Sequence, residues 1–373
     1  MTHFDEYIRQ GEPSQQEKAQ IWKTAIGLQD VDGLKVSDYL IETAKENIED
    51  RITIDEVQYR IDNYYKMQSN RQSETEARTE EADKVAARIT EILSEKTFSF
   101  SPAAYCNIHS RLFVGIYKFA GKIRDYNISK SEWVLDGESV LYASSDYLKE
   151  TLEYDFKEEK AFSYKGLNTQ QVIEHLAHFI AYLWQIHVFG EGNTRTTAVF
   201  LIKYLHKLGF KYVNNTLFAN HSWYFRNALV RANYEDLSRG VFKTQIFIIR
   251  FLSNLLLNEN NILKNRTLHI HFHELNVILP QNTGGQKIEN MKDNGGQKNI
   301  FGGQKKWSEK VVGLLELLAA NPTMTRKALS EKLQINPSAV QKHIEKLKAE
   351  GIIERIGSDK KGSWRVSVSA IPY

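Results

Sequence analysis

The sequence of 373 residues contains a single cysteine, Cys106, and only 6 prolines. One cysteine excludes an intrachain disulfide framework and any zinc site built from several thiolates. Scarce proline, set against 18 Phe and 18 Tyr, favours long uninterrupted helices with large rings in their cores. The composition, 42% hydrophobic and 25% charged, is that of a globular protein, and the length predicts two or three domains.

Long hydrophobic runs are also absent. The most apolar stretch, Phe242 to Leu257, contains Lys243, Gln245, Arg250 and Asn254, so we expect no membrane span and no membrane partner. The first residues, MTHFDEYIRQGEP, lack the apolar segment of a signal peptide, so we expect a cytoplasmic protein. No G-x-x-x-x-G-K-[ST] motif occurs, which excludes a P-loop as the site of any ATP use.

An excess of positive charge is confined to the C-terminal end. Residues 305–373 contain 13 Lys and Arg against 7 Asp and Glu, a balance of +6. The other residues contain 36 against 39, a balance of −3, and the formal net charge of the chain is +3. A basic block on an otherwise slightly acidic chain indicates that any contact with nucleic acid is made by the C-terminal part.

Composition and periodicity divide the chain into four main segments. Residues 1–67 predict short helices with too small a core of their own, so we expect them to dock on the next segment. Residues 84–279 show helical periodicity, except that alternation in KIRDYNISKSEWVL (122–135) predicts a short β-hairpin. Residues 280–306, rich in Gly, Asn and Lys, predict a flexible linker before a last domain at 307–373.

The last segment has the element order of a winged helix-turn-helix. Helices predicted at 308–319, 325–333 and 337–350 are followed by strands at 352–356 and 364–368. The third helix would be the recognition helix, and its outward face would present Ser338, Gln341, Lys342 and Glu345. Lys360 and Lys361, between the strands, suit contacts with phosphates. The alternative is a helical module for protein contacts, but the basic charge favours nucleic acid.

The residues most informative about chemistry are HVFGEGNTRTT, His187 to Thr197. A predicted helix ends before them, and another begins near Asn193 after a glycine-containing loop. A helix N-terminus binds anions, and Arg195 in its first turn opposes the helix dipole, which favours a phosphate partner. Glu191 is a hard oxygen ligand of the kind Mg²⁺ prefers, and His187 can accept a proton near neutral pH. On spacing alone, a tight turn with solvated Glu191 and Arg195 explains the stretch equally well.

This stretch resembles the signature of the Fic (Fic/Doc) family, H-x-F-x-[DE]-G-N-G-R-x-x-R. The matching residues are His187, Phe189, Glu191, Gly192, Asn193 and Arg195. Gly121 and Arg124, before the predicted hairpin, resemble the start of the family's flap, and residues 223–233 resemble the helix that lines its base pocket. The resemblance implies a mainly α fold: a Fic-type helical core with a short β-hairpin flap, plus the C-terminal winged helix domain.

Family members typically transfer AMP from ATP to a Ser, Thr or Tyr hydroxyl of a protein. The resemblance therefore implies ATP and Mg²⁺ as cofactors and a protein target, which can be the chain itself. His187 would be the general base and Glu191 the Mg²⁺ ligand. The residues implied in nucleotide binding are Gly192, Asn193, Thr194, Arg195 and Asn233. The flap residues Ile128, Ser129 and Lys130 would hold the target by strand addition.

Two positions depart from the signature. Thr194 stands where the family has Gly, and it adds a β-carbon and a hydroxyl where a phosphate would approach. Ala198 stands where the family has a second Arg, which removes a charge-assisted contact worth roughly 1.5–3 kcal/mol. The alternative functions are therefore a DNA-binding transcriptional regulator with a catalytically weak or inactive, nucleotide-sensing Fic core, and a pure interaction scaffold.

The N-terminal segment resembles the small antitoxin-like domains that restrain some Fic enzymes through [ST]-x-x-x-E-[GN]. Thr2 and Glu6 have the right spacing, but Tyr7 follows them, so the motif is absent. We therefore expect that no N-terminal carboxylate, Glu6 and Asp32 included, restrains the site. Any restraint should come from packing of the helix around Trp22.

Two histidine clusters are weaker candidates for a metal site. His269, His271 and His273 alternate, but their polar surroundings favour a solvated segment. His175 and His178 lie one helical turn apart, which is more typical of core residues. The sequence leaves open the protein target, the DNA sequence bound and whether the chain forms a homo-oligomer.

Overall fold

The computed structural model describes residues 3–68, 73–210 and 213–272, and in the C-terminal part 314, 317–318, 321–333, 335–349, 353–356 and 363–366. These fall into two compact units, one of residues 3–237 and 243–272 and one that contains the residues from 314 on. The predicted linker 280–306, the loop with Lys360 and Lys361, and His273 lie outside the described residues. Both units are mainly helical, as the composition predicts.

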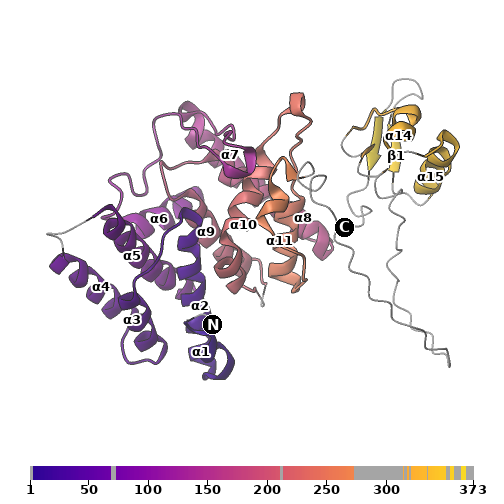
Figure 1. Ribbon diagram of the computed structural model, residues 1–373. Coiled ribbons are helices and arrows are strands. Elements are labelled where there is room, and N and C mark those ends of the chain that lie inside the picture. The colour runs from indigo at the N-terminus through magenta and orange to yellow at the C-terminus, as the bar shows by residue number, and fades with distance from the viewer. Residues whose placement is uncertain are drawn as a thin grey trace, which may run out of the picture. The chain divides into compact units, whose positions relative to one another are not determined.

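The first unit is built from helices joined by loops and 3₁₀ turns (Figure 1). Its α-helices are α1 (Asp5–Gln10), α2 (Pro13–Gly27), α3 (Asp38–Ile48), α4 (Ile54–Gln68), α5 (Glu74–Ser94), α6 (Pro102–Phe113), α7 (Leu148–Ala161), α8 (Thr169–Ile186), α9 (Asn193–Lys207), α10 (Thr216–Asn233) and α11 (Ile246–Leu257). The 3₁₀ turns assigned within residues 3–272 are η1 (Leu28–Asp32), η2 (Trp133–Leu135), η3 (Ser145–Tyr147), η4 (Leu237–Arg239) and η5 (Asn265–Leu268).

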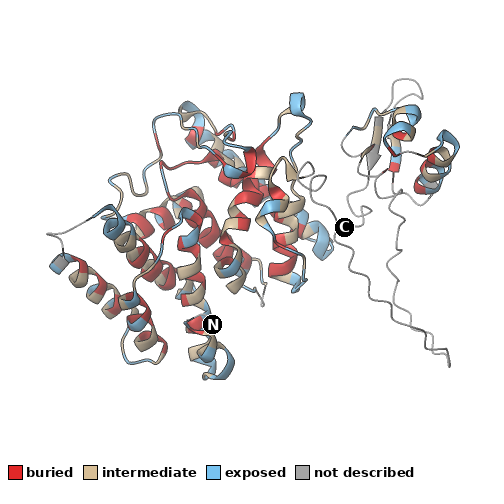
Figure 2. Ribbon diagram, in the orientation of Figure 1, coloured by how far each residue is buried: buried red, intermediate tan, exposed pale blue. Residues whose placement is uncertain are grey.

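The N-terminal segment is part of the first unit. Its helix α2 packs against α5 and α10, and Trp22 is fully buried, with its indole N–H donating to Asn47 Oδ1 at 2.9 Å. Figure 2 shows the buried faces of α2 and α5 turned toward the interior. At the end of α2 the two backbones nearly touch, because a β-carbon on Gly27 would lie 2.1 Å from Ala219 Cα. Residues 3–67 therefore dock on the segment that follows, as predicted, and they belong to the same unit as residues 84–237 and 243–272.

Buried charges join α5 to its neighbours. Asp83 accepts hydrogen bonds from Ser37 N–H (2.8 Å) and from the Tyr65 hydroxyl (2.7 Å), which ties α3, α4 and α5 together. At the other end of α5, the ammonium of Lys203 donates to Ile92 O at 3.0 Å. A cation there satisfies a carbonyl that has no partner within its helix and complements the helix dipole. These contacts fix α5 against α9.

Residues 122–145, which we call the flap, differ from the predicted hairpin. The whole segment is described, and it is extended without forming a β-strand. It turns at η2, where Glu132 N–H donates to Glu138 O at 2.9 Å. Next to that turn a side chain joins the two arms, because Lys130 N–H donates to Ser139 Oγ at 3.1 Å. The two arms are thus linked in part by side-chain hydrogen bonds, whereas the predicted hairpin would link them by hydrogen bonds between backbones.

The second unit contains α14 (Arg326–Leu333), α15 (Pro337–Ala349) and an antiparallel pair of strands, β1 (Ile353–Ile356) and β2 (Ser363–Val366). Ile353 is opposite Val366, and Ile356 is opposite Ser363. Its small core is formed by Leu314, Leu318, Leu329, Leu333, Val340, Ile344, Leu347 and Ile353. The predicted apolar face of the third helix therefore does pack inward.

We predict that Gly27→Ala lowers the stability of the protein. Alanine ordinarily stabilises a helix by about 1 kcal/mol relative to glycine. Here its β-carbon would collide with the backbone of α10, and overpacking of this kind costs about 1–3 kcal/mol. The midpoint of urea unfolding should fall at unchanged slope, whereas Gln20→Ala, on the exposed side of α2, should leave it nearly unchanged. A more stable Gly27→Ala protein would contradict the close packing.

Candidate active site and nucleic-acid interface

The chain changes direction sharply between α8 and α9. After Ile186, His187 takes a left-handed backbone conformation (φ 51°, ψ 57°). Arg124 holds this end of α8: its Nε donates to His187 O at 2.8 Å and its Nη2 to Ile186 O at 3.4 Å. The last carbonyls of a helix have no partner within it, so a buried guanidinium satisfies them and complements the dipole. Arg124 therefore positions His187.

The side chain of His187 lies in an aromatic pocket and is 3% exposed. Its ring centre is 4.2 Å from that of Tyr142 and 5.2 Å from that of Trp184. Neither ring nitrogen has a hydrogen-bond partner among the described residues. Burial, together with the nearby charge of Lys130, lowers the pKa of His187 well below its usual value. The imidazole is therefore neutral at pH 7 and able to accept a proton.

Helix α9 begins at Asn193 with an open N-terminus. Gly192 precedes it at φ 77°, and a β-carbon there would lie 2.4 Å from the ring of Phe113, so both backbone and packing require glycine. No side chain caps the helix, which leaves the first N–H groups without a helical partner. Such groups bind anions, and the helix–loop–helix predicted from the motif is present.

The side chains of Asn193 and Thr194 are engaged within the protein. Asn193 Nδ2 donates to Phe189 O at 2.7 Å, and its Oδ1 accepts from Phe189 N–H at 3.0 Å, so it closes the motif loop. Thr194 Oγ1 accepts from the indole N–H of Trp184 at 3.0 Å. The group this loop offers to a phosphate is therefore its backbone rather than these two side chains.

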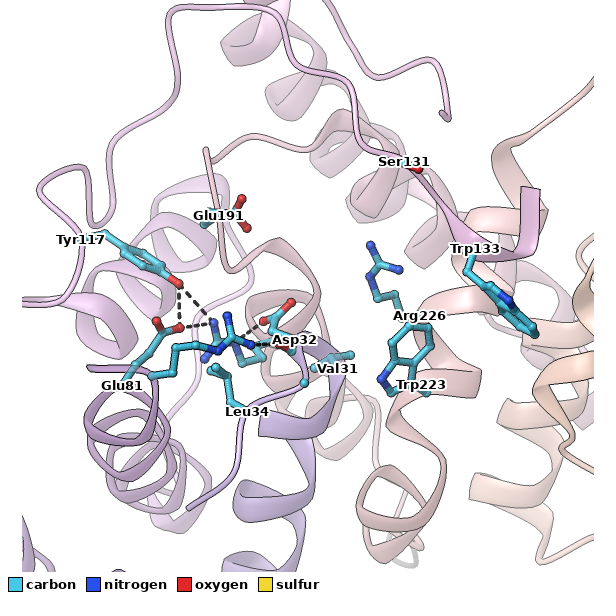
Figure 3. Close-up of a pocket in the computed structure, with 13 residues that line it drawn as sticks. Val31, Asp32, Leu34, Glu81, Tyr117, Ser131, Trp133, Glu191, Trp223 and Arg226 are labelled. Atoms are coloured by element: carbon cyan, nitrogen blue, oxygen red, sulfur yellow. Dashed lines mark hydrogen bonds and ion pairs between the residues drawn. The ribbon is translucent and has the colours of Figure 1, made fainter. Parts of the chain in front are cut away.

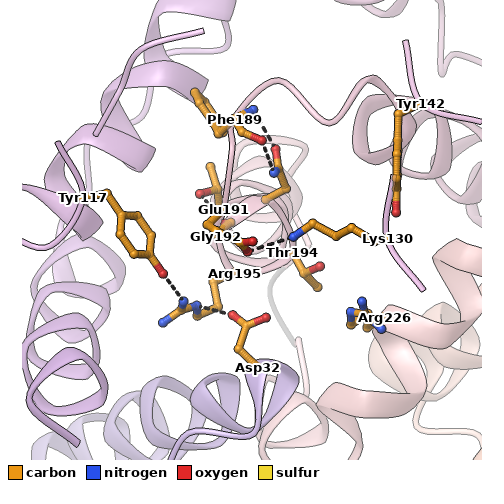
Figure 4. A network of polar contacts seen from close by, with 12 residues as sticks. Asp32, Tyr117, Lys130, Tyr142, Phe189, Glu191, Gly192, Thr194, Arg195 and Arg226 are labelled. Atoms are coloured by element: carbon orange, nitrogen blue, oxygen red, sulfur yellow. Dashed lines mark hydrogen bonds and ion pairs between the residues drawn. The ribbon is translucent and has the colours of Figure 1, made fainter. Parts of the chain in front are cut away.

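Glu191 and Lys130 join the motif loop to the flap. The carboxylate of Glu191 is about half exposed, and its Oε2 lies 2.8 Å from Lys130 Nζ. Figure 4 shows Lys130 reaching toward the start of α9. Of the other two flap residues predicted to bind the target, Ser129 is exposed and Ile128 is half-buried. The sequence assigned Lys130 and Glu191 to separate tasks, and the structure brings them together.

Arg195 is buried, at 1% exposure, and protein groups surround it (Figure 4). Its Nε is 2.8 Å from Asp32 Oδ2, and its Nη2 is 2.6 Å from Glu81 Oε1. Its Nη1 donates to Gln29 Oε1 at 3.0 Å, and its guanidinium lies over the Phe113 ring at 4.8 Å. Burial acts to lower the pKa of Arg195, but the neighbouring carboxylates keep it above its usual value. In this arrangement Arg195 is not free to bind a phosphate.

Sequence reasoning missed these partners of Arg195. It expected no N-terminal carboxylate to restrain the site, whereas Asp32 contacts Arg195 directly. Gln29 is 166 positions and Glu81 114 positions away along the chain, and no local pattern pairs residues at such separations. That neither Asp32 nor Glu6 restrains activity stays a prediction.

A cavity of about 540 Å³ opens beside the motif (Figure 3). Its charged lining residues are Asp32, Arg78, Glu81, Glu191, Arg195 and Arg226, and its aromatic ones are Tyr117, Trp133 and Trp223. In Figure 3 the cluster of Glu81 and Asp32 faces Trp223 and Arg226 across the cavity. The volume falls within the roughly 300–1,000 Å³ of small-molecule sites. Its lining suits a ligand that carries both charge and a flat apolar ring.

Arg226, on α10, anchors the flap. Its Nη1 is 2.6 Å from Glu132 Oε2, and its Nη2 donates to Glu132 Oε1 at 3.0 Å. The Tyr142 hydroxyl also donates to this fully buried carboxylate at 3.3 Å. Burial raises the pKa of Glu132, and Arg226 opposes that shift. Because removing one partner of a buried pair leaves an uncompensated charge, the pair fixes the flap firmly to α10.

Asn233 is not among the described residues that line the cavity, and its role at a nucleotide base stays a prediction. Its Nδ2 donates to Ala181 O at 2.8 Å and to Leu229 O at 2.9 Å, so both amide hydrogens are taken. It joins α10 to α8. Trp223, earlier on the same helix, lines the cavity instead.

His109, which sequence reasoning did not single out, connects α6, the turn before the flap and the motif loop. Gly121 N–H donates to its Nδ1 at 2.8 Å, so its Nε2 carries the hydrogen and donates to Glu191 O at 3.0 Å. Its ring stacks on Phe189 at 3.7 Å. Burial lowers the pKa of His109 to about 4. The geometry of the motif loop thus depends on a neutral histidine.

The candidate nucleic-acid interface is the outward face of α15. Ser338, Lys342 and Glu345 are exposed there, as predicted. Gln341 is half-buried, accepts from Arg326 Nη1 at 2.6 Å and donates to Glu345 Oε1 at 2.6 Å. Ser338 and Lys342 are thus the outward residues best placed to reach a partner.

The histidine clusters form no metal site within the part of the chain that the structure describes. His271 Nε2 lies 3.3 Å from Asp136 Oδ2. His175 is half-buried and contacts the buried carboxylate of Glu159 at 2.6 Å, but His178 is exposed, so the prediction that both are core residues is wrong for His178. Among the helices with assigned positions, none is long and apolar enough to cross a membrane.

We predict that acid destabilises the protein through His109. In the unfolded chain the pKa of this residue is about 6.5, whereas in the folded protein it is about 4. Stability is therefore full above pH 6.5 and falls as the pH drops toward 4, by about 3 kcal/mol from this residue. His187 acts in the same direction.

His109→Gln removes this titration and should flatten the fall in unfolding free energy between pH 7 and pH 4.5, measured by urea unfolding. His3→Gln, a substitution of the same kind at an exposed position, provides the matched control. An unchanged pH dependence in His109→Gln would contradict the assignment.

Comparisons with known proteins agree with this geometry. The Fic/DOC family matches residues 99–205, and the winged helix-turn-helix DNA-binding family matches residues 309–354. One similar solved structure is the N-terminal FIC domain of the VirB-translocated effector Bep8 from Bartonella sp. 1-1C, at 17% identity. It covers 50% of this chain and 88% of its own, with a TM-score of 0.40.

A second is a Fic family protein from Desulfovibrio desulfuricans G20, at 10% identity, covering 98% of this chain and 94% of its own with a TM-score of 0.42. The chain contains a Fic/DOC family domain at residues 99–205 and a winged helix-turn-helix domain at residues 309–354.

Proposed function

We propose that this protein transfers AMP from ATP to a hydroxyl side chain of a protein. Fic domains typically transfer a nucleoside monophosphate to proteins. The observation that carries the proposal is the state of His187: neutral, buried among aromatic rings, and without a hydrogen-bond partner among the described residues for either ring nitrogen. An imidazole held in this way beside an open helix N-terminus is prepared to take a proton from a hydroxyl that attacks a bound phosphate.

The residues around the cavity fit ATP and Mg²⁺. The first turn of α9 offers uncapped N–H groups to the phosphates, and the glycine before it leaves no side chain over that end of the helix. Glu191 has the partly exposed carboxylate that would hold Mg²⁺, whose charge would offset that of the phosphates. Trp223 and Trp133 line the same cavity and could stack on a flat base.

The proposed step balances as a displacement at the α-phosphorus. His187 removes the proton of the target hydroxyl, the hydroxyl oxygen forms a bond to the α-phosphorus, and the bond to the outer two phosphates breaks. Pyrophosphate leaves, and the protein target keeps the AMP. The backbone N–H groups of α9 and the ammonium of Lys130 would stabilise the negative charge that develops. Residues 128–130 of the flap would align the target chain beside His187.

A second function is favoured by the contacts of Arg195. Two carboxylates and an amide oxygen already surround the guanidinium of Arg195. Ala198 stands at the position where the signature has a second arginine, so no second guanidinium is supplied there. A core with this arrangement would bind a nucleotide weakly or without turnover. The protein would then act chiefly as a DNA-binding regulator that senses the nucleotide.

Transfer of label from ATP distinguishes the two functions. We predict that wild-type protein with Mg²⁺ and α-labelled ATP labels itself or a protein in a cell extract, and that His187→Ala lowers the rate by about 10²–10⁴. ATP binding, measured by calorimetry, should change little, because the imidazole acts on the hydroxyl. Undiminished transfer by the variant would remove His187 as the base. ATP binding without any transfer by wild type would favour the sensing function.

The winged helix domain is proposed to bind DNA through α15. We predict that Lys342→Ala, in the full chain, weakens binding to a random-sequence duplex at low salt and reduces the salt slope by about one unit. The matched control is Lys157→Ala, which removes an exposed lysine from α7 in the other unit. If both variants bind DNA as the wild type does, α15 is not the interface.

A further inference from the structure

A second cavity, of about 270 Å³, lies beside the flap and shares no lining residue with the first. Its walls come from the returning arm of the flap (141–143), the end of α8 and one face of α7. Gln185 Nε2 donates to Leu141 O at 2.9 Å, which holds the flap arm against α8 along this cavity. Neither the motif nor the family matches give it a ligand.

Asp155 is the one acidic or basic side chain that lines this cavity. It lies on α7 among apolar and neutral neighbours, and among the described residues it has no hydrogen-bond or ion-pair partner. Burial raises the pKa of its carboxyl to about 6. A partly desolvated carboxylate without a partner is costly in the free protein and gains from a cation that enters the cavity.

The cavity lies next to the proposed general base. Tyr142 forms part of its wall, and the ring of the same residue packs against His187 at 4.2 Å. Ile186, which also lines it, immediately precedes His187. An extended chain advances about 3.3 Å per residue. A residue close in sequence to the hydroxyl at His187 can therefore place its side chain here.

Exposed apolar side chains surround the cavity. Leu141 is 84% exposed and Tyr182 39% exposed, and both line it. Clusters of exposed apolar side chains are typical of protein interaction sites, and tyrosine is enriched among the residues that contribute most to binding.

We propose that this cavity binds a lysine or arginine side chain of the protein that receives the nucleotide, with Asp155 as its counter-ion. The aliphatic stem of such a side chain packs on Leu141 and Tyr182, and its charged end meets the carboxylate. The inference rests on the proposed function, since it names the class of target: a protein with a basic residue a few positions from the modified hydroxyl.

The test measures peptide binding, so that it does not depend on transfer. Fluorescent peptides contain one Thr and, at each of the three positions on either side in turn, Lys or its uncharged analogue norleucine. Binding to the full-length protein is followed by fluorescence anisotropy. Wild type should bind the best Lys peptide at least about fivefold tighter than its norleucine partner. Asp155→Asn should abolish this preference, and Asp155→Lys should transfer it to peptides with Glu at the same position.

Glu153→Gln is the matched control, because Glu153 is exposed on α7 and does not line the cavity. It should keep the wild-type preference. Equal binding of Lys and norleucine peptides by wild type, or a preference that survives in Asp155→Asn, would overturn the proposal. If the protein prefers lysine peptides but transfers no AMP, the proposed binding site stands and the proposed function is rejected. If the protein transfers AMP but shows no lysine preference, the proposed function stands and the binding site is rejected.

Discussion

The buried guanidinium of Arg195 is the constraint around which the first unit is organised. A cation at 1% exposure requires compensation, and Asp32, Glu81 and Gln29 supply it from η1 and α5. The charge therefore draws the N-terminal segment and α5 onto the first turn of α9. The same contacts place acidic groups at the wall of the cavity, so the interaction that assembles the fold also sets the electrostatics that a nucleotide would meet.

The motif loop is held mainly by groups that do not take part in chemistry. Arg124 binds the carbonyls at the end of α8, Asn193 closes the loop on Phe189, and His109 supports Glu191 through its backbone. Each of these contacts is buried or nearly so and involves the main chain of the loop. The backbone is thus fixed while the imidazole of His187 and the carboxylate of Glu191 are left available, which is the preorganisation that catalysis requires.

Sequence reasoning recovered the features that depend on local pattern. Helical periodicity, the glycine before Asn193 and the spacing of the motif predicted α8, the loop and α9, and the apolar spacing around Val340 and Ile344 predicted the inward face of α15. It failed for contacts between residues far apart in the sequence, and in the flap, where a side-chain hydrogen bond takes the place of a β-ladder. The contact of Asp32 with Arg195 joins two residues that no local pattern pairs. The flap alternates like a hairpin, but a serine side chain takes the bond that a ladder would make.

The contact of Gly27 with Ala219 limits how the N-terminal segment can move. Sliding of α2 along α10 by one residue would carry Ile26 or Leu28 to the point where even a β-carbon does not fit. Small shear motions between these helices are therefore blocked, whereas separation of the whole segment as a rigid body remains sterically open. A conformational change that widens the cavity on this side would therefore be all-or-none. Its free-energy cost would come from breaking the ion pairs of Arg195 and from exposing Trp22.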